Sequence, residues 1–180
     1  MTTLFLWSQI LGGIAMLISV IAVQIKGLQT MRVMMFISTL FRGTHYFLLG
    51  FPHAAIIEYV TGSRWLASVF THRTWVKVVF VLVILGIGLS IDEEWTGYLA
   101  TFGAILGTLA AFSKDDRHMR IYLIVAMIVW VIHNILIFSP VAIISSVFFL
   151  SSTMIGYERF YHHRHIYLYP HQPVHHPKAR

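Results

Sequence analysis

The chain matches itself without a gap when it is shifted by 88 residues, and this internal duplication constrains its fold more than any other feature. Between positions 7 and 63, 12 of 57 residue pairs are identical at this offset. Apolar matches arise often by chance in a hydrophobic chain, so the weight rests on rarer residue types: Trp7/Trp95, Lys26/Lys114, Arg32/Arg120, His45/His133 and Pro52/Pro140. A single fixed offset predicts two similar structural units joined in one chain.

The composition indicates a membrane protein. Hydrophobic residues make up 57% of the chain and charged residues 11%, which leaves too little polar surface to cover a soluble domain. Each of seven apolar stretches approaches the ~20 residues with which a helix crosses about 30 Å of hydrocarbon. The stretches are 4–24, 33–50, 54–70, 75–91, 95–112, 121–138 and 141–157. We therefore predict an all-α polytopic membrane protein with seven transmembrane helices.

The basic residues favour one orientation, because Lys and Arg near helix ends collect on the cytoplasmic side of a membrane. With the N-terminus outside, the cytoplasmic loops and tail hold eleven basic residues, and the outer loop at 92–94 is acidic. The eleven are Lys26, Arg32, Arg73, Lys77, Lys114, Arg117, Arg120, Arg159, Arg164, Lys178 and Arg180. The sequence thus predicts an external N-terminus, a cytoplasmic C-terminus, and an attraction to anionic lipid in place of nucleic-acid binding.

The duplication and the spans together predict a 3+1+3 layout. Residues 1–73 form the first three-helix repeat, 74–94 a linker helix with the acidic loop, and 95–157 the second repeat. The single linker helix restores the chain direction, so the repeats are expected to be parallel. Residues 158–180 are rich in His and Pro and are expected to be a disordered cytoplasmic tail. Two interpretations of that tail stay open, a collector of transition metals and a weakly basic solvated segment.

Polar and aromatic residues inside the predicted spans form a candidate solute site. An ionisable group at the centre of a bilayer costs ~2.5 to 3.5 kcal/mol even on the lenient insertion scale, so each one needs an explanation. Helical spacing places these residues on single faces of the second, third and sixth stretches. The candidate substrate-binding residues are Arg42, His45, Tyr46, Glu58, Trp65, Trp130, His133 and Asn134.

These candidate residues lie at similar depths in the membrane, so we expect their side chains to come close together. With a rise of about 1.5 Å per residue from the turns at Pro52 and Pro140, Glu58, His45 and His133 all lie roughly 9 to 11 Å below the outer boundary. Two interpretations remain open for this level. It is either a polar cavity for a solute, or a structural contact in which Glu58 only neutralises Arg42. We expect Arg64 to extend toward the cytoplasm or to cap a neighbouring helix, and His53 and His72 to be loop residues.

Short motifs resemble a known family. The run from Trp130 to Asn134, the run from His45 to Gly50, and Gly86-Ile87-Gly88-Leu89 resemble the YgjV-type bacterial inner-membrane proteins over roughly residues 4 to 157. This resemblance implies the bacterial inner (plasma) membrane. More distantly, the 3+1+3 layout resembles the SWEET sugar facilitators, the PnuC nicotinamide riboside transporters and the PQ-loop group. The chain departs from the PQ signature, since Pro52 precedes His53 and Pro140 precedes Val141.

These patterns favour a transporter or facilitator of a small polar solute that works by alternating access. Arg42 would bind an anionic or hydroxyl-rich group, Tyr46 and Asn134 would hydrogen-bond, and the tryptophans would stack on a ring. Glu58, His45 and His133 are the groups able to couple proton movement. A non-transporting receptor or assembly protein and a divalent-metal pathway remain alternatives. We expect no enzyme, cofactor or resident metal, and the absence of cysteine excludes disulfides and thiolate sites.

Overall fold

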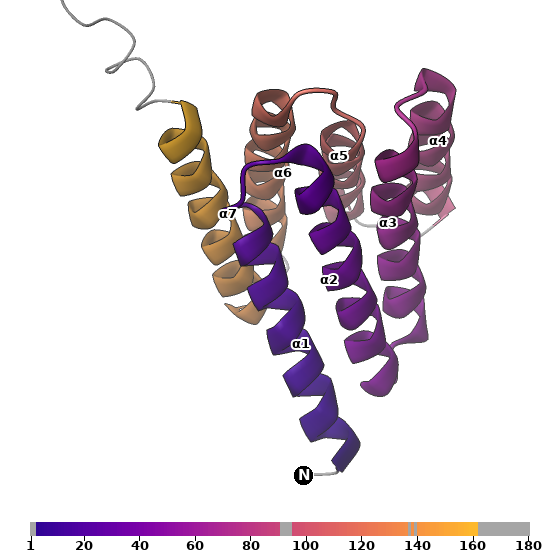
Figure 1. Cartoon of the computed structure of the whole chain (residues 1–180). Helices are drawn as coiled ribbons and strands as arrows, with labels where there is room; N and C mark the ends of the chain where they lie inside the picture. Colours follow the sequence, from indigo (N-terminus) through magenta and orange to yellow (C-terminus); the bar gives the residue numbers. More distant parts are fainter. Residues whose placement is uncertain (1–2, 91–94, 137, 139, 162–180) are drawn as a thin grey trace, which may run out of the picture.

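The computed structural model describes residues 3–90, 95–136, 138 and 140–161, and this part of the chain forms seven helices, as predicted (Figure 1). The helices are α1 (Thr3–Ala22), α2 (Leu28–Leu48), α3 (Pro52–Phe70), α4 (Thr74–Ser90), α5 (Trp95–Ala111), α6 (Asp116–Leu136) and α7 (Pro140–Tyr161). The turn before α3 contains Gly50 at a positive φ of 82°, and Pro52 supplies the first turn of the helix. Both residues suit a sharp reversal followed by a helix start.

Two helix boundaries correct the sequence analysis. The apolar stretches begin at 33 and 121, but α2 begins at Leu28 and α6 at Asp116. Arg32 and Arg120, which the orientation argument placed in cytoplasmic loops, are therefore inside helices and are only 1% and 0% exposed. A hydropathy profile ends a span at a charged residue, whereas a helix continues through a charge that finds hydrogen-bond partners.

The C-terminal boundary also differs. The helix α7 continues to Tyr161, so residues 158–161 are helical and do not belong to a disordered tail. The rest of the predicted tail, 162–180, and the acidic loop at 92–94 lie outside the described residues.

The helices pack as two groups of three. The helix α2 lies between α1 and α3, and α6 lies between α5 and α7, while α4 packs on α5. We call α1–α3 the first bundle and α5–α7 the second bundle. The bundles meet where α1 contacts α7 and where α3 contacts α5, and Figure 1 shows α1 and α7 side by side.

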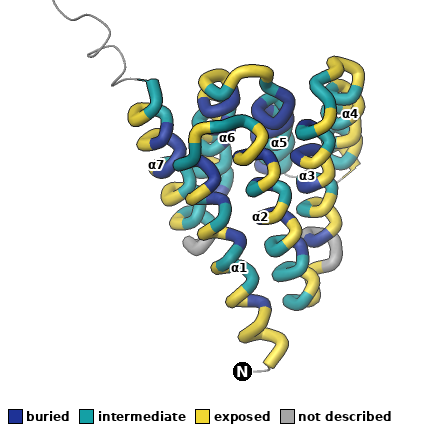
Figure 2. Tube along the Cα trace, viewed as in Figure 1, coloured by how far each residue is buried: buried dark blue, intermediate teal, exposed yellow. Residues whose placement is uncertain are grey.

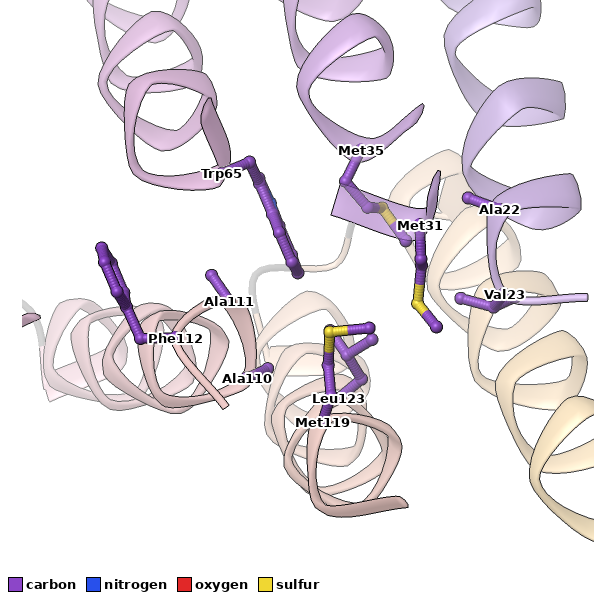
Figure 3. Packing of buried hydrophobic residues seen from close by; sticks show 10 residues of the cluster. All are labelled: Ala22, Val23, Met31, Met35, Trp65, Ala110, Ala111, Phe112, Met119 and Leu123. Atoms are coloured by element: carbon purple, nitrogen blue, oxygen red, sulfur yellow. The ribbon is translucent and has the colours of Figure 1, made fainter. Parts of the chain in front are cut away.

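The hydrophobic core lies where the bundles meet, at the end where α1 and α5 finish and α2 and α6 begin. We call this end the arginine end, because Arg32 and Arg120 are buried there. Figure 3 shows the cluster, which draws side chains from α1, α2, α3, α5 and α6. Its buried members are Ala22, Val23, Met31, Met35, Trp65, Ala110, Ala111, Phe112, Met119 and Leu123.

The distribution of polarity is that of a membrane bundle. Large apolar side chains are exposed along every helix, for example Leu17 at 57% and Phe148 at 61%, and Figure 2 shows exposed positions along the bundle surface. The fully buried side chains include polar ones: Ser8, Arg32, Ser38, Ser68, Thr108, Arg120 and Thr153. A soluble protein shows the opposite arrangement, whereas helices in lipid satisfy their polar groups internally.

By length and composition, the described helices α1 and α6 can cross a membrane, and α4 and 96–111 are apolar but shorter. The remaining helices α2, α3 and α7 contain 21, 19 and 22 residues and are less apolar than α1.

Candidate solute site and contacts between the bundles

The centre of the candidate site is an ion pair between α2 and α3. The Nε atom of Arg42 lies 3.8 Å from Oε2 of Glu58, and the two side chains are 38% and 19% exposed. The Nη2 atom of Arg42 donates to Oγ of Ser38 at 3.1 Å, and Ser38 in turn contacts Ser19 at 2.8 Å. The Oε2 atom of Glu58 is buried and has no hydrogen-bond partner among the described residues. The pair is therefore a loose contact, with acceptor capacity on the carboxylate left unused.

Two histidines make equivalent contacts in the two bundles. Nδ1 of His45 lies 2.6 Å from the carbonyl oxygen of Ser8, and Nδ1 of His133 lies 3.0 Å from that of Thr96. A carbonyl oxygen only accepts, so each Nδ1 carries the hydrogen and donates it. In a neutral ring Nε2 is then the proton-accepting atom. The ring of His45 packs against α1, because a Cβ placed on Gly12 would lie 3.1 Å from Nδ1.

The other predicted residues are distributed over three places. Tyr46 is close enough to Arg42 and Glu58 to interact with both charges. Trp130 meets His133 edge to face, with ring centroids 5.4 Å apart. Asn134 is buried and donates to Oγ of Ser146 at 2.8 Å and to the carbonyl of Ala142 at 3.3 Å, both on α7. Trp65 lies in the core cluster, where its neighbours are apolar.

The structure gathers these residues within each bundle. In the described part of the chain, no hydrogen bond, ion pair or ring contact joins Arg42 or Glu58 to Trp130, His133 or Asn134. The described part of the chain also contains no group of three His, Asp or Glu side chains placed to hold a metal ion. The residues that do connect the bundles are ones that sequence reasoning assigned elsewhere.

Arg32 and Arg120 connect the bundles by binding backbone carbonyls. Arg32 on α2 donates from Nε to the carbonyl of Ala111 at 3.0 Å and from Nη2 to that of Ser113, at the end of α5. Arg120 on α6 donates from Nη1 to the carbonyl of Val23 and from Nη2 to that of Ile25 at 2.7 Å, just past the end of α1. The last carbonyls of a helix lack partners within the helix, and its C-terminus favours a cation.

The two arginines differ in what surrounds the guanidinium. Arg120 donates from Nε to Oδ2 of Asp116 at 2.9 Å, and Tyr161 donates to the same oxygen. Its guanidinium carbon also lies 4.9 Å from the ring centre of Phe160. Arg32 has no carboxylate partner among the described residues, and its Nη1 lies 3.4 Å from Nε2 of His72.

His72 lies in the short loop between α3 and α4 at the arginine end. Partial burial and the charges of Arg32 and Lys114 lower the pKa of this imidazole below its usual value of 6.5. Arginine can only donate, so Nε2 of His72 accepts and the neutral ring carries its hydrogen on Nδ1. That Nδ1 is buried without a hydrogen-bond partner in the described part of the chain.

Arg64 and Ser152 make further contacts between the bundles. Arg64 on α3 is 7% exposed and donates from Nη1 to the carbonyl of Ala104 at 2.8 Å and to Oγ1 of Thr108 at 3.0 Å, both on α5. It neither extends toward the surface nor caps a helix end, in contrast to the sequence prediction. Ser152 on α7 donates to the carbonyl of Val20 at 3.1 Å, and Gln24 donates to Ser152 Oγ at 2.8 Å.

One signal in the sequence could have indicated the connecting arginines. Met31-Arg32 and Met119-Arg120 are identical dipeptides at the repeat offset, and both methionines are fully buried. A charged residue that recurs at the repeat offset beside an apolar residue indicates a buried structural contact, and this indication carries more information than counting the residue as one more cytoplasmic charge.

Comparison with known proteins identifies the family. The pattern that defines the Imp-YgjV family, described as bacterial inner membrane protein, matches residues 6–164. The chain is also 33% identical over 92 residues to "Inner membrane protein YgjV" of Escherichia coli (strain K12), an alignment that covers 51% of this chain and 50% of that relative. The chain thus spans about half the length of the curated relative it matches. No solved structure matches. Because the family pattern covers most of its length, the chain belongs to the Imp-YgjV family of bacterial inner membrane proteins.

Proposed function

We propose that the protein is a transporter or facilitator of a small polar solute, which binds at the Arg42–Glu58 pair and crosses the membrane by alternating access. The observation that carries the proposal is the incomplete burial of this pair, with Arg42 at 38% and Glu58 at 19% exposed. A contact whose only role is to hold helices together gains from excluding water and satisfying every polar atom. The two side chains of this pair stay partly exposed, and Oε2 of Glu58, although itself buried, has no hydrogen bond within the described residues.

The open side of the pair is assigned to an aqueous path. An arginine that faces hydrocarbon is costly, whereas one that faces a water-filled cavity is not. A solute with a hydrogen-bond donor would use the free acceptor capacity of Glu58, and an anionic or hydroxyl-bearing group would bind Arg42. Tyr46, His45, Trp130, His133 and Asn134 are the further residues proposed to line the path.

Reciprocal contacts support a parallel repeat of the two bundles, one of the repeat arrangements on which alternating access is built. Arg32 and Arg120 are 88 residues apart, and so are the carbonyls they bind, Val23 with Ala111 and Ile25 with Ser113. A pseudo-two-fold axis that exchanges the bundles would produce this pattern. Such an axis lies along the membrane normal in parallel-repeat transporters.

The side that is closed in this structure is proposed to be the cytoplasmic one. The hydrogen bonds that Arg32, Arg64, Arg120 and Ser152 make between the bundles lie between the middle of α5 and the arginine end, and the core cluster lies at the same end. With the N-terminus outside, the arginine end faces the cytoplasm. The structure would then represent a state that is closed on the cytoplasmic side.

A ligand-stabilisation screen tests the proposal. The purified protein in detergent is heated in the presence of sugars, nucleosides, vitamins, amines and small carboxylates, because a ligand that binds only the folded state raises the melting temperature. The variants Arg42→Gln and Glu58→Gln should lose the shift. The control Asp115→Asn removes an exposed carboxylate in the α5–α6 loop and should retain it. The proposal fails if no solute stabilises the wild type, or if the shift survives in both site variants.

A further inference from the structure

The two arginine contacts at the arginine end are similar in geometry but different in chemistry. Each guanidinium binds two backbone carbonyls of the opposite bundle. Asp116 holds Arg120 through a charged hydrogen bond, and the residue 88 positions before Asp116 is Leu28. Phe160 lies against Arg120, and the residue 88 positions before it is His72, which lies against Arg32. One contact is thus held by a carboxylate and the other is adjacent to a titratable base.

We propose that Arg32 and His72 form a proton-sensitive latch, which keeps the bundles together at the arginine end while His72 is neutral and releases the C-terminal end of α5 when His72 is protonated. The proposal deepens the proposed function, since it assigns a regulated gate to the same carrier. No proton acceptor other than His72 Nε2 is needed for the switch.

The atoms at the contact explain the switch. In the neutral ring, Nε2 accepts a hydrogen from Nη1 of Arg32 and helps to hold the guanidinium toward the carbonyls of Ala111 and Ser113. A proton on Nε2 would put two donors and two positive charges 3.4 Å apart. Among the described residues, the charged groups that act on His72 are Arg32 from α2 and Lys114 from the α5–α6 loop, and both are basic. With no acid among them, the repulsion has no local compensation.

The second arginine contact should not respond in the same pH range. Arg120 has Asp116 as its partner and Phe160 in place of an imidazole. A phenyl ring cannot gain a proton, so no positive charge can appear beside Arg120 at the position that His72 occupies beside Arg32. The latch is therefore asymmetric, with the end of α1 retained and the end of α5 released.

Cysteine labelling tests this asymmetry, and the chain contains no cysteine of its own. Ala111→Cys reports on the Arg32 contact and Val23→Cys on the Arg120 contact, and both positions are 0% exposed. The purified full-length variants are labelled with a maleimide at about pH 8 and about pH 5.5, on either side of the usual histidine pKa. Because thiols react more slowly at low pH, each rate is divided by that of the same variant unfolded in detergent at that pH.

The latch predicts that the corrected rate at Ala111→Cys rises by about fivefold or more at the lower pH, the range of an ordinary coupling. Val23→Cys should stay protected, and His72→Phe, which introduces the side chain found beside Arg120, should abolish the rise. An unchanged rate at Ala111→Cys, an equal rise at Val23→Cys, or a rise that persists with His72→Phe would each overturn the proposal.

A second matched pair keeps the test decisive if a core cysteine impairs folding. Ser113→Cys and Ile25→Cys occupy the other two carbonyl positions and should show the same contrast. The assay contains no solute, so it distinguishes the two proposals. A carrier without the latch would bind solute but show no pH effect on labelling, and a latch without transport would show the reverse.

Discussion

Arg32 and Arg120 make the same contact with exchanged partners: Arg32 of the first bundle binds the end of α5, and Arg120 of the second bundle binds the region just after α1. Both side chains are fully buried. Each supplies donors to carbonyls that a helix leaves unpaired at its C-terminus. The contact therefore satisfies backbone groups and closes one end of the molecule at the same time.

Loss of the carboxylate beside Arg120 should destabilise the fold. Asp116→Leu, which introduces the residue found at the equivalent position near Arg32, should lower the free energy of unfolding by about 1–3 kcal/mol, since a charged hydrogen bond to a buried donor is lost. Chemical denaturation in detergent measures the change. Asp115→Asn is the matched control, because Asp115 is 55% exposed and should change stability little. Equal effects of the two substitutions would contradict this role of Asp116.

Close packing at the arginine end should make Gly156 intolerant of substitution. A Cβ at this position would overlap the carbonyl oxygen of Val23 and lie 2.8 Å from Nη1 of Arg120. Gly156→Ala should therefore cost about 1–3 kcal/mol through overpacking and should weaken the Arg120 contact. Gly13→Ala and Gly86→Ala are controls, since a Cβ at either position meets no atom within 4 Å. If Gly156→Ala left the melting temperature unchanged, α7 would have to lie farther from the end of α1 than it does in this structure.

The helices were predictable from the sequence because apolar runs of membrane-spanning length leave few alternatives. The connecting contacts were not, since Arg32 and Arg120 bind backbone carbonyls, and a carbonyl has no signature in a sequence. Hydropathy also placed the start of α2 and of α6 after Arg32 and Arg120, because it cannot foresee that tertiary hydrogen bonds bury these charged residues. Trp65 shows the same limit, because an aromatic residue on a polar helix face can equally enter the core, as it does here.

The environment of His72 predicts the direction in which stability changes with pH. Its pKa is lowered in the folded protein relative to 6.5, so the unfolded chain binds a proton that the folded chain excludes. The contribution of neutral His72 to the free energy of unfolding is therefore fully present above pH 6.5. It is lost as the pH falls from 6.5 through the lowered pKa of the folded protein. Melting temperatures should decline more steeply for the wild type than for His72→Phe as the pH falls through this window. Parallel curves would show that His72 is not linked to folding.

The proposed orientation can be measured independently of function. A reporter that is active only in the cytoplasm should be active when it is fused after Arg180. A reporter that is active only outside the membrane should be active when it is inserted at Glu93, because the basic residues of the loops collect on one side. An external C-terminus would reverse the assignment of the arginine end and contradict the inward-closed interpretation.

The central claim is that Arg42 and Glu58 bind a transported solute, and uptake by proteoliposomes tests it most directly. The solute that stabilises the protein is supplied in radiolabelled form to vesicles that contain wild type, Glu58→Gln or the double variant Arg42→Met with Glu58→Met. We predict that all three are folded, that the wild type accumulates or equilibrates the solute, and that both variants lose uptake by about tenfold or more. The result that would contradict the account is uptake in the double variant equal to that of the wild type, or single variants that unfold while the double variant recovers full stability.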